Sequence, residues 1–254
     1  MIKHYLKVAF RNLMKYKTQS LVSIIGLAVG FTCFALSALW IRYEMTYDNF
    51  HKGSDRIYMV RAHYANEPGT SKFTPYPLME YLQDKMPEIE AATAFTPHHV
   101  KFRLEETEQE VGMIDADSVF MNFFDIQLLK GTVNFLKSDG QEVAITKEFA
   151  KRLFSKEEDA LGKEVEVGRR VCKIGAIVSG WSNHSNIPYN ILAPARHSPR
   201  WGSSNEQLFI RVRERTDIDA FRTKMSTVRI NDIEKESELS DLLITRMSAL
   251  RYSD

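Results

Sequence analysis

Histidine and cysteine are among the side chains whose spacing could support base, nucleophile or metal-ligand chemistry. Its seven histidines include the adjacent pair His98 and His99. Neighbours on a strand point to opposite faces of a sheet, so we interpret this pair as surface residues rather than joint metal ligands. His184 could serve as a base, but no serine or cysteine with an arranged partner accompanies it. Cys33 and Cys172 fall in different kinds of segment, so the sequence predicts neither a disulfide framework nor a metal site.

Motifs for nucleotide binding and for hydrolysis are missing from the sequence. A phosphate-binding loop needs a glycine five positions before its Gly-Lys pair, and Gly162-Lys163 lacks it. Neither G-x-S-x-G nor H-E-x-x-H occurs in the chain. We therefore expect no enzymatic activity, no cofactor and no metal. A cleaved, secreted enzyme is an alternative, but the sequence shows no arrangement of catalytic residues that supports it.

Aromatic residues offer packing rather than chemistry. We interpret Trp181 and Trp201 as packing residues rather than ligand platforms. The cluster of Phe120, Phe123 and Phe124 reads as core, with a partner-facing groove as the alternative.

Charge is distributed unevenly along the chain. Six of the 34 basic residues and none of the 33 acidic residues lie among the first 42 positions. The rest of the chain is mildly acidic, which argues against nucleic acid as a partner. Over the whole chain, the apolar share of 44% and the charged share of 26% are those of a globular protein, so composition gives no sign of disorder.

An uncharged run separates the basic head from the acidic body. Residues 18–41 carry no charge, and 24 residues are long enough to cross a bilayer, so we expect a transmembrane helix over 18–42. Trp40 and Tyr43 stand where an aromatic belt would lie. Since five of the six basic residues among the first 42 positions precede the run, the N-terminus is expected in the cytoplasm and the body outside.

A cleaved signal peptide is the alternative interpretation of this run. Ala35-Leu36-Ser37 could pass for a small-residue cleavage site. The apolar core of a signal peptide is shorter, however, at about 7–15 residues, so we prefer an uncleaved anchor.

Basic residues recur at every fourth position before the apolar run: Lys3, Lys7, Arg11 and Lys15. With apolar residues on the other face, this spacing predicts an amphipathic helix over residues 1–17 that lies along the inner leaflet. The alternative is an n-region without fixed structure.

Two glycines within the apolar run are spaced for helix packing. Gly26 and Gly30 form a G-x-x-x-G, which lets a second helix approach closely. Because glycine is common in membrane helices, the motif alone carries little weight.

Residues 43–254 are expected to form a folded domain of the α+β class on the outer side of the membrane. A strand over residues 56–65 begins soon after the apolar run, so a short aromatic-rich link would join body and helix stiffly. Strand–helix–strand order at both ends of the body predicts an outer subdomain over about 43–105 and 205–254. A second subdomain, over about 106–204, would be inserted into it. The other predicted elements are a helix over 75–86, strands over 89–96, 206–213 and 241–247, a helix over 218–228 capped by Asp217, and mixed strands and helices over 109–129, 142–154 and 171–180.

Four blocks of the sequence resemble the FtsX-like, MacB-type permeases of ABC transporters. They are the head MIKHYLKVAFRNLMKYKTQSLVSIIGLAVG, the segment YEMTYDNFHKGSDRIYMV, and the two later blocks DADSVFMNFFDIQLLKGT and EVAITKEFAKRLFSKEEDALGKEVEV. Each block is a modest motif, but their order and spacing behind one membrane helix are specific. The resemblance runs from the first residues to about Val228 and implies a MacB-like periplasmic core fold with two subdomains.

The chain departs from the family pattern at several positions. Ser155 and Ala160 stand where Gly and Pro are usual, and Asn186 and Asn190 where His and Asp are usual. Such permeases also continue into three further membrane helices and a cytoplasmic coupling loop. We therefore expect a fragment or a truncated relative, which alone would not couple to an ATPase in the family's way.

The resemblance implies a mechanical role in the inner membrane. A separate ABC ATPase subunit would hydrolyse ATP in the cytoplasm, and membrane helices would carry that motion to the periplasmic domain, which moves a substrate or activates a partner. The stiff link from Trp40 to Tyr58 is what such transmission requires. The implied partners are the ATPase, a second permease copy or homologue, the membrane, and an adaptor or envelope protein.

Two other functions compete with the permease. A single-span, membrane-anchored periplasmic sensor or binding protein would need no further membrane helices. An anchored periplasmic chaperone or assembly factor would bind envelope proteins but no ATPase.

Overall fold

The computed structural model describes residues 2–45, 48, 51, 53–64, 68–181, 185–228 and 239–252. The chain divides into two units, Met1–Thr46 and Tyr47–Asp254, which we call the head and the body and treat separately.

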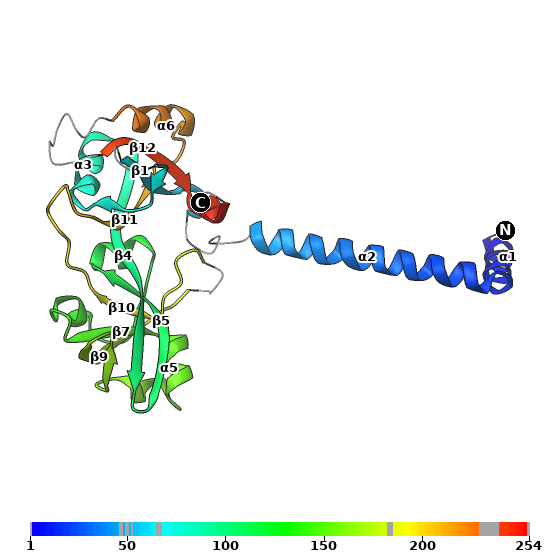
Figure 1. Ribbon diagram of the computed structural model, residues 1–254, viewed down its shortest axis with the longest axis horizontal. Helices are drawn as coiled ribbons and strands as arrows, with labels where there is room; N and C mark the ends of the chain where they lie inside the picture. Colours follow the sequence, from blue (N-terminus) through cyan, green and yellow to red (C-terminus); the bar gives the residue numbers. More distant parts are fainter. Residues whose placement is uncertain are drawn as a thin grey trace. The chain divides into compact units, whose positions relative to one another are not determined.

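The head consists of two helices, α1 (Ile2–Lys15) and α2 (Lys17–Met45), with a break at Tyr16 (Figure 1). At about 1.5 Å per residue, the 29 residues of α2 reach farther than the roughly 30 Å of a hydrocarbon core. Its apolar side chains face outward: Leu27 is 76% exposed and Phe31 70% exposed. By length and composition α2 could span a membrane, and it extends three residues beyond the expected end at residue 42.

The body is built on one mixed sheet. Its twelve described strands follow the order β12-β1-β11-β4-β5-β10-β7-β9-β6, with β2, β3 and β8 paired off this path. Their bounds are β1 Ile57–Tyr64, β2 Thr70–Ser71, β3 Thr74–Pro75, β4 Ile89–Leu104, β5 Thr107–Ala116, β6 Leu128–Gly131, β7 Glu142–Thr146, β8 Glu164–Val167, β9 Arg170–Val178, β10 Ile191–Pro194, β11 Ser204–Val212 and β12 Leu239–Arg246. Most pairs are antiparallel, and β10–β5 and β7–β9 are parallel.

Four α-helices of the body begin where local chemistry favours it. Pro77 opens α3 (Pro77–Lys85), and its fixed φ suits the first turn of a helix. Side chains of Asp117, Thr146 and Asp217 accept hydrogen bonds from backbone N–H groups in the first turn of α4 (Ser118–Phe123), α5 (Lys147–Leu153) and α6 (Ile218–Ser226). Short 3₁₀ helices are η1 Ser54–Arg56, η2 Val133–Lys137, η3 Glu157–Ala160 and η5 Met247–Tyr252.

The longest strand, β4, joins the two halves of the body (Figure 1). Residues 89–95 pair with β11, and residues 96–104 pair with β5. The sequence predicted a strand only over residues 89–96, whereas β4 continues through Pro97, which lacks the N–H that a ladder uses, to Leu104. Proline is tolerated where a strand has a single neighbour, and Pro97 pairs only with Ile114.

Three hydrophobic clusters fill the body. One lies among β1, β11, β12, α3 and α6, and includes Leu82 and Phe221. Another lies among β7, β9, β10 and α5, and includes Phe149. The third holds the aromatic residues of α4 against Phe95 and Phe209. We keep the division into an outer and an inserted subdomain as a proposal, with β4 passing from one to the other.

Candidate functional site

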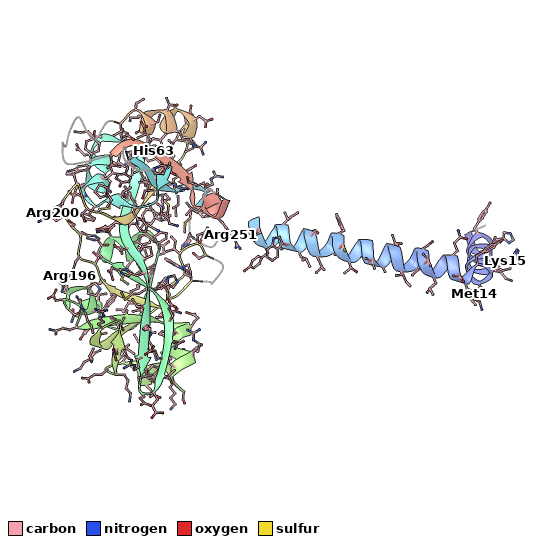
Figure 2. All side chains as sticks on the ribbon, in the orientation of Figure 1. Met14, Lys15, His63, Arg196, Arg200 and Arg251 are labelled. Carbon is pink, nitrogen blue, oxygen red and sulfur yellow. The ribbon has the colours of Figure 1, made fainter. Side chains whose placement is uncertain are left out.

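The basic residues of the head lie on α1. Lys7, Arg11 and Lys15 are exposed and follow one another at four-residue steps, which places them on one face of the helix. Figure 2 labels Lys15 beside Met14 at the end of α1. The side chain of Lys3 is outside the part of the chain that the structure describes. The interfacial role of these residues stays a prediction.

Gly26 and Gly30 lie one turn apart on α2. A Cβ built on either glycine meets nothing within 4 Å among the described residues. This face of α2 therefore has room for the close approach of another helix. Packing against a partner helix at these glycines stays a prediction.

Two aromatic rings mark the C-terminal end of α2. The centroids of Trp40 and Tyr43 are 6.2 Å apart with an interplanar angle of 38°, and both side chains are exposed. Amphipathic rings of this kind suit the boundary between hydrocarbon and headgroups.

Asp48 ties the start of the body to a distant segment. Its carboxylate is fully buried and its backbone is left-handed, with φ of 56°. Ser185 Oγ donates to Oδ1 at 2.5 Å, and the Asn186 backbone N and Nδ2 donate to Oδ2 at 3.1 and 2.6 Å. Asn186 Nδ2 also donates to the Met247 carbonyl at 3.3 Å. A buried carboxylate with charge-assisted donors holds these three parts of the chain together.

His51 fastens the same region to the aromatic cluster. Its ring lies 4.8 Å from Trp181 and 5.1 Å from Phe124, between centroids, and is buried. Burial, reinforced by the charge of Arg211 and opposed by that of Asp125, lowers the pKa of His51 from 6.5 to about 4. The imidazole is therefore neutral at neutral pH.

Trp181 and Trp201, which the sequence marked as packing residues, are half-buried and pack against two of the hydrophobic clusters of the body. Phe120, Phe123 and Phe124 are buried, and Trp181 packs against their cluster. Trp181 Nε1 donates to the Ile187 carbonyl at 2.8 Å, which fixes the segment that holds Asp48.

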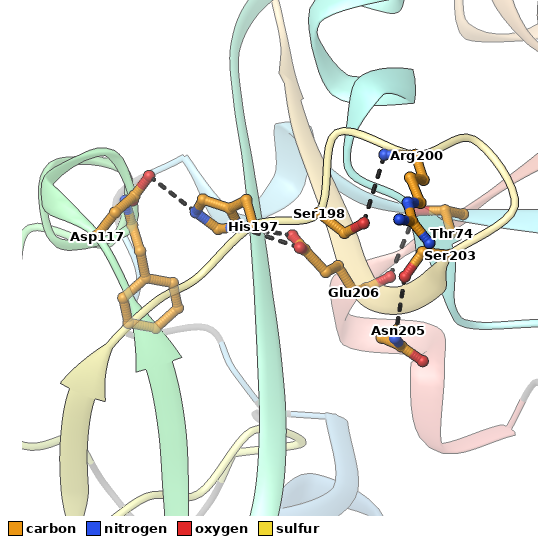
Figure 3. A network of polar contacts seen from close by, with 9 residues as sticks. Thr74, Asp117, His197, Ser198, Arg200, Ser203, Asn205 and Glu206 are labelled. Atoms are coloured by element: carbon orange, nitrogen blue, oxygen red, sulfur yellow. Dashed lines mark hydrogen bonds and ion pairs between the residues drawn. The ribbon is translucent and has the colours of Figure 1, made fainter. Parts of the chain in front are cut away.

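A second polar network joins β5, β11 and the connection between β10 and β11 (Figure 3). His197 Nδ1 lies 2.9 Å from Glu206 Oε2, and His197 Nε2 lies 3.3 Å from Asp117 Oδ2. The imidazole stacks on Tyr76 with centroids 4.0 Å apart. Burial opposes the charge of His197, but the hydrogen bonds with Asp117 and Glu206 outweigh it and raise its pKa to about 9. The network is thus a cation held between two carboxylates.

The remaining histidines and the two cysteines form no reactive site among the described residues. His98 pairs with Asp115 at 2.8 Å, whereas His99 is exposed, as expected for neighbours on opposite faces of β4. Burial raises the pKa of Cys172 on β9 to about 11, so its thiol is not ionised at neutral pH. Cys33 lies on α2. His184 is outside the described residues. Within the described ranges, no three His, Cys, Asp or Glu side chains are gathered so that they could hold a metal ion.

Sequence reasoning missed both networks. Asp48 lies in the block YDNFH, and Asn186 is one of the departures from the family pattern, but no spacing connects positions 138 residues apart. The same holds for Asp117 and His197, which are 80 residues apart.

Comparison with known proteins identifies a family. The model of the MacB-like periplasmic core domain matches residues 20–228. No curated protein matched the chain significantly.

Three solved structures share the fold. A domain of a permease protein from Porphyromonas gingivalis is 20% identical with a TM-score of 0.61, over 77% of this chain and 92% of that one. The extracellular domain of the ABC-type transporter YknZ from Gram-positive bacteria is 14% identical with a TM-score of 0.55, over 74% and 99%. The periplasmic region of MacB from Actinobacillus actinomycetemcomitans is 12% identical with a TM-score of 0.54, over 78% and 92%. The expected fold class, a mixed α/β domain after one N-terminal apolar helix, is confirmed.

Proposed function

Because the chain belongs to the family of MacB-like periplasmic core domains, we propose that it is the N-terminal part of an ABC transporter permease subunit that transmits motion to the periplasm. In this proposal α2 spans the inner membrane, α1 lies on its cytoplasmic face, and the body lies in the periplasm. The basic residues Lys7, Arg11 and Lys15 before α2 support this orientation by the positive-inside rule.

ATP hydrolysis belongs to a separate ABC ATPase subunit in this proposal, and a second permease copy or homologue packs against the membrane helix. The surface around Gly26 and Gly30 offers room for such a helix. The body then acts on a substrate, an adaptor or an envelope protein without chemistry of its own.

The observation that carries the proposal is the anchorage of Asp48. Only two residues separate it from Met45, the last residue of α2. In this proposal, movement of the helix end reaches Asp48 and passes through Ser185 and Asn186 to the middle of the body. A flexible start of the body would absorb such movement instead.

Two experiments test the proposal. A tag at the natural gene should allow the protein to be purified from its own membranes together with an ABC ATPase in near-stoichiometric amount. A Gly-Ser insertion after Tyr47, a residue outside the described ranges, should abolish transport by the assembled transporter and leave ATP hydrolysis intact. Purification without any ATPase, or transport at the normal rate with the insertion, would contradict the proposal.

A further inference from the structure

A cleft of about 400 Å³ opens on one face of the sheet, on the half of the body that contains β7, β9 and β10. Alternate residues line it, because they share one face of a strand. They include His98 and Val100 on β4, and Met113 and Asp115 on β5. Its volume is within the range of about 300–1,000 Å³ that is typical of small-molecule sites.

The inner part of the cleft is apolar. Val143, Val167, Cys172 and Ala193 line it and are buried. The Cys172 thiol donates to the Val165 carbonyl and is not ionised at neutral pH, so it adds no charge. This surface suits the apolar body of a ligand.

The mouth of the cleft is basic. Arg169 and Arg170 are exposed where β8 turns into β9, and Arg196, labelled in Figure 2, also lines the cleft from the connection after β10. A Cβ built on Gly140 would meet Arg170 Nη1 at 3.3 Å, so the guanidinium of Arg170 lies close over Gly140. Arg196 forms an ion pair with Asp139, so its charge is already compensated.

No acidic side chain of the described cleft lining forms an ion pair with Arg169 or Arg170. Asp115 is the acidic side chain among the described lining residues, and it faces His98 at 2.8 Å. His197, the other histidine of the lining, is already held between two carboxylates. Arg169 and Arg170 therefore give the mouth an excess of positive charge.

We propose that this cleft binds a small amphipathic anion, with its apolar body on Val143, Val167 and Ala193 and its carboxylate or phosphate group on Arg169 and Arg170. A guanidinium matches the two oxygens of either group with paired hydrogen bonds. The charge of the mouth and the apolar interior together select such a ligand over an uncharged lipid or a hydrophilic anion. This ligand site is independent of the proposed transmission of motion, and its failure would leave that proposal standing.

Equilibrium dialysis of radiolabelled decanoate tests the site. The full chain is placed in phosphatidylcholine nanodiscs, and binding to empty nanodiscs is subtracted. We expect saturable binding with one site per chain, and at least tenfold weaker binding of decanol, which has the same apolar body without the charge. The double variant Arg169→Ala/Arg170→Ala should bind decanoate at least tenfold more weakly.

A matched control separates a specific site from a general effect of charge. Arg222→Ala/Lys224→Ala also removes two positive charges, from the ion pairs with Asp219 and Glu88, and lies on α6, which contributes no residue to the cleft lining. This variant should bind decanoate as the unmodified protein does. Ala195→Trp, which fills the cleft from its lining, should prevent binding while far-UV circular dichroism stays unchanged.

Any of four results would overturn the proposal. They are no saturable decanoate binding above the empty nanodiscs, equal binding of decanol, equal losses in the two double variants, and undiminished binding by a folded Ala195→Trp variant.

Discussion

Asn186 Nδ2 donates to Asp48 Oδ2 at 2.6 Å, so an amide from the middle of the chain hydrogen-bonds to a buried carboxylate only three residues after the end of α2. The backbone N–H of Asn186 donates to the same oxygen at 3.1 Å. This pair is a stable attachment only while both partners keep their hydrogen-bonding roles, because an unsatisfied buried group costs about 1–3 kcal/mol.

Asp48→Asn should therefore destabilise the body. Its new NH₂ group would face the donors of Ser185 and Asn186, and we expect the free energy of unfolding to fall by about 1–3 kcal/mol. Urea unfolding followed by tryptophan fluorescence measures the change. Asp84→Asn, at an exposed aspartate, is the control, and an equal loss there would refute the role of Asp48.

The stability of the body should decline above neutral pH because of His197. Its pKa is about 9 in the folded state against 6.5 ordinarily, so its contribution is complete below 6.5 and is lost as the pH rises through 9. This shift of the His197 pKa contributes up to about 3 kcal/mol to the free energy of unfolding. His197→Gln should flatten this part of the profile, and Tyr76, Asp117 and Glu206 around it are unchanged in both proteins. If the two proteins lose stability in parallel from pH 6.5 to 9, His197 is not the cation of the network.

His51 should make the body less stable at acid pH, in contrast to His197, which does so at alkaline pH. Its pKa of about 4 in the folded state, against 6.5 ordinarily, means that stability is complete above 6.5 and is lost as the pH falls towards 4. His51→Phe keeps an aromatic ring against Phe124 and Trp181 and should remove this acid dependence. Thermal unfolding between pH 4 and 6.5 measures it, and an unchanged slope in the variant would exclude His51 as the cause.

The glycines of α2 provide a test of membrane packing. Gly26→Ile/Gly30→Ile should reduce co-purification of a partner permease subunit severalfold, since two branched side chains would separate the helices. Ala28→Ile/Thr32→Ile places the same two isoleucines on the opposite face of α2 and serves as the control. Equal co-purification by both variants would show that the partner packs elsewhere.

Local chemistry made much of the fold predictable. The uncharged run predicted α2, and Asp217 marked the start of α6, whereas the helix expected from Pro75 begins two residues later, at Pro77. In each case the signal lies within one turn or one run of sequence.

The functional features depend on contacts that no local pattern records. His197, Asp117 and Glu206 come from three separate segments that only the sheet brings together. Likewise, Arg169, Arg170 and Arg196 form a basic mouth although the body as a whole is mildly acidic. Net charge describes the sum over a surface, whereas a site depends on where the charges gather.

The most direct test of the account is whether the body follows α2. Leu39→Cys on α2 and Leu243→Cys on β12, both exposed positions, would carry spin labels in a protein with Cys33→Ser and Cys172→Ser. Distances between the labels are measured by electron–electron double resonance in nanodiscs. We predict one narrow distribution that broadens when Asp48 and Asn186 are both replaced by alanine. A broad distribution in the protein with Asp48 and Asn186 intact would contradict transmission of motion through this attachment.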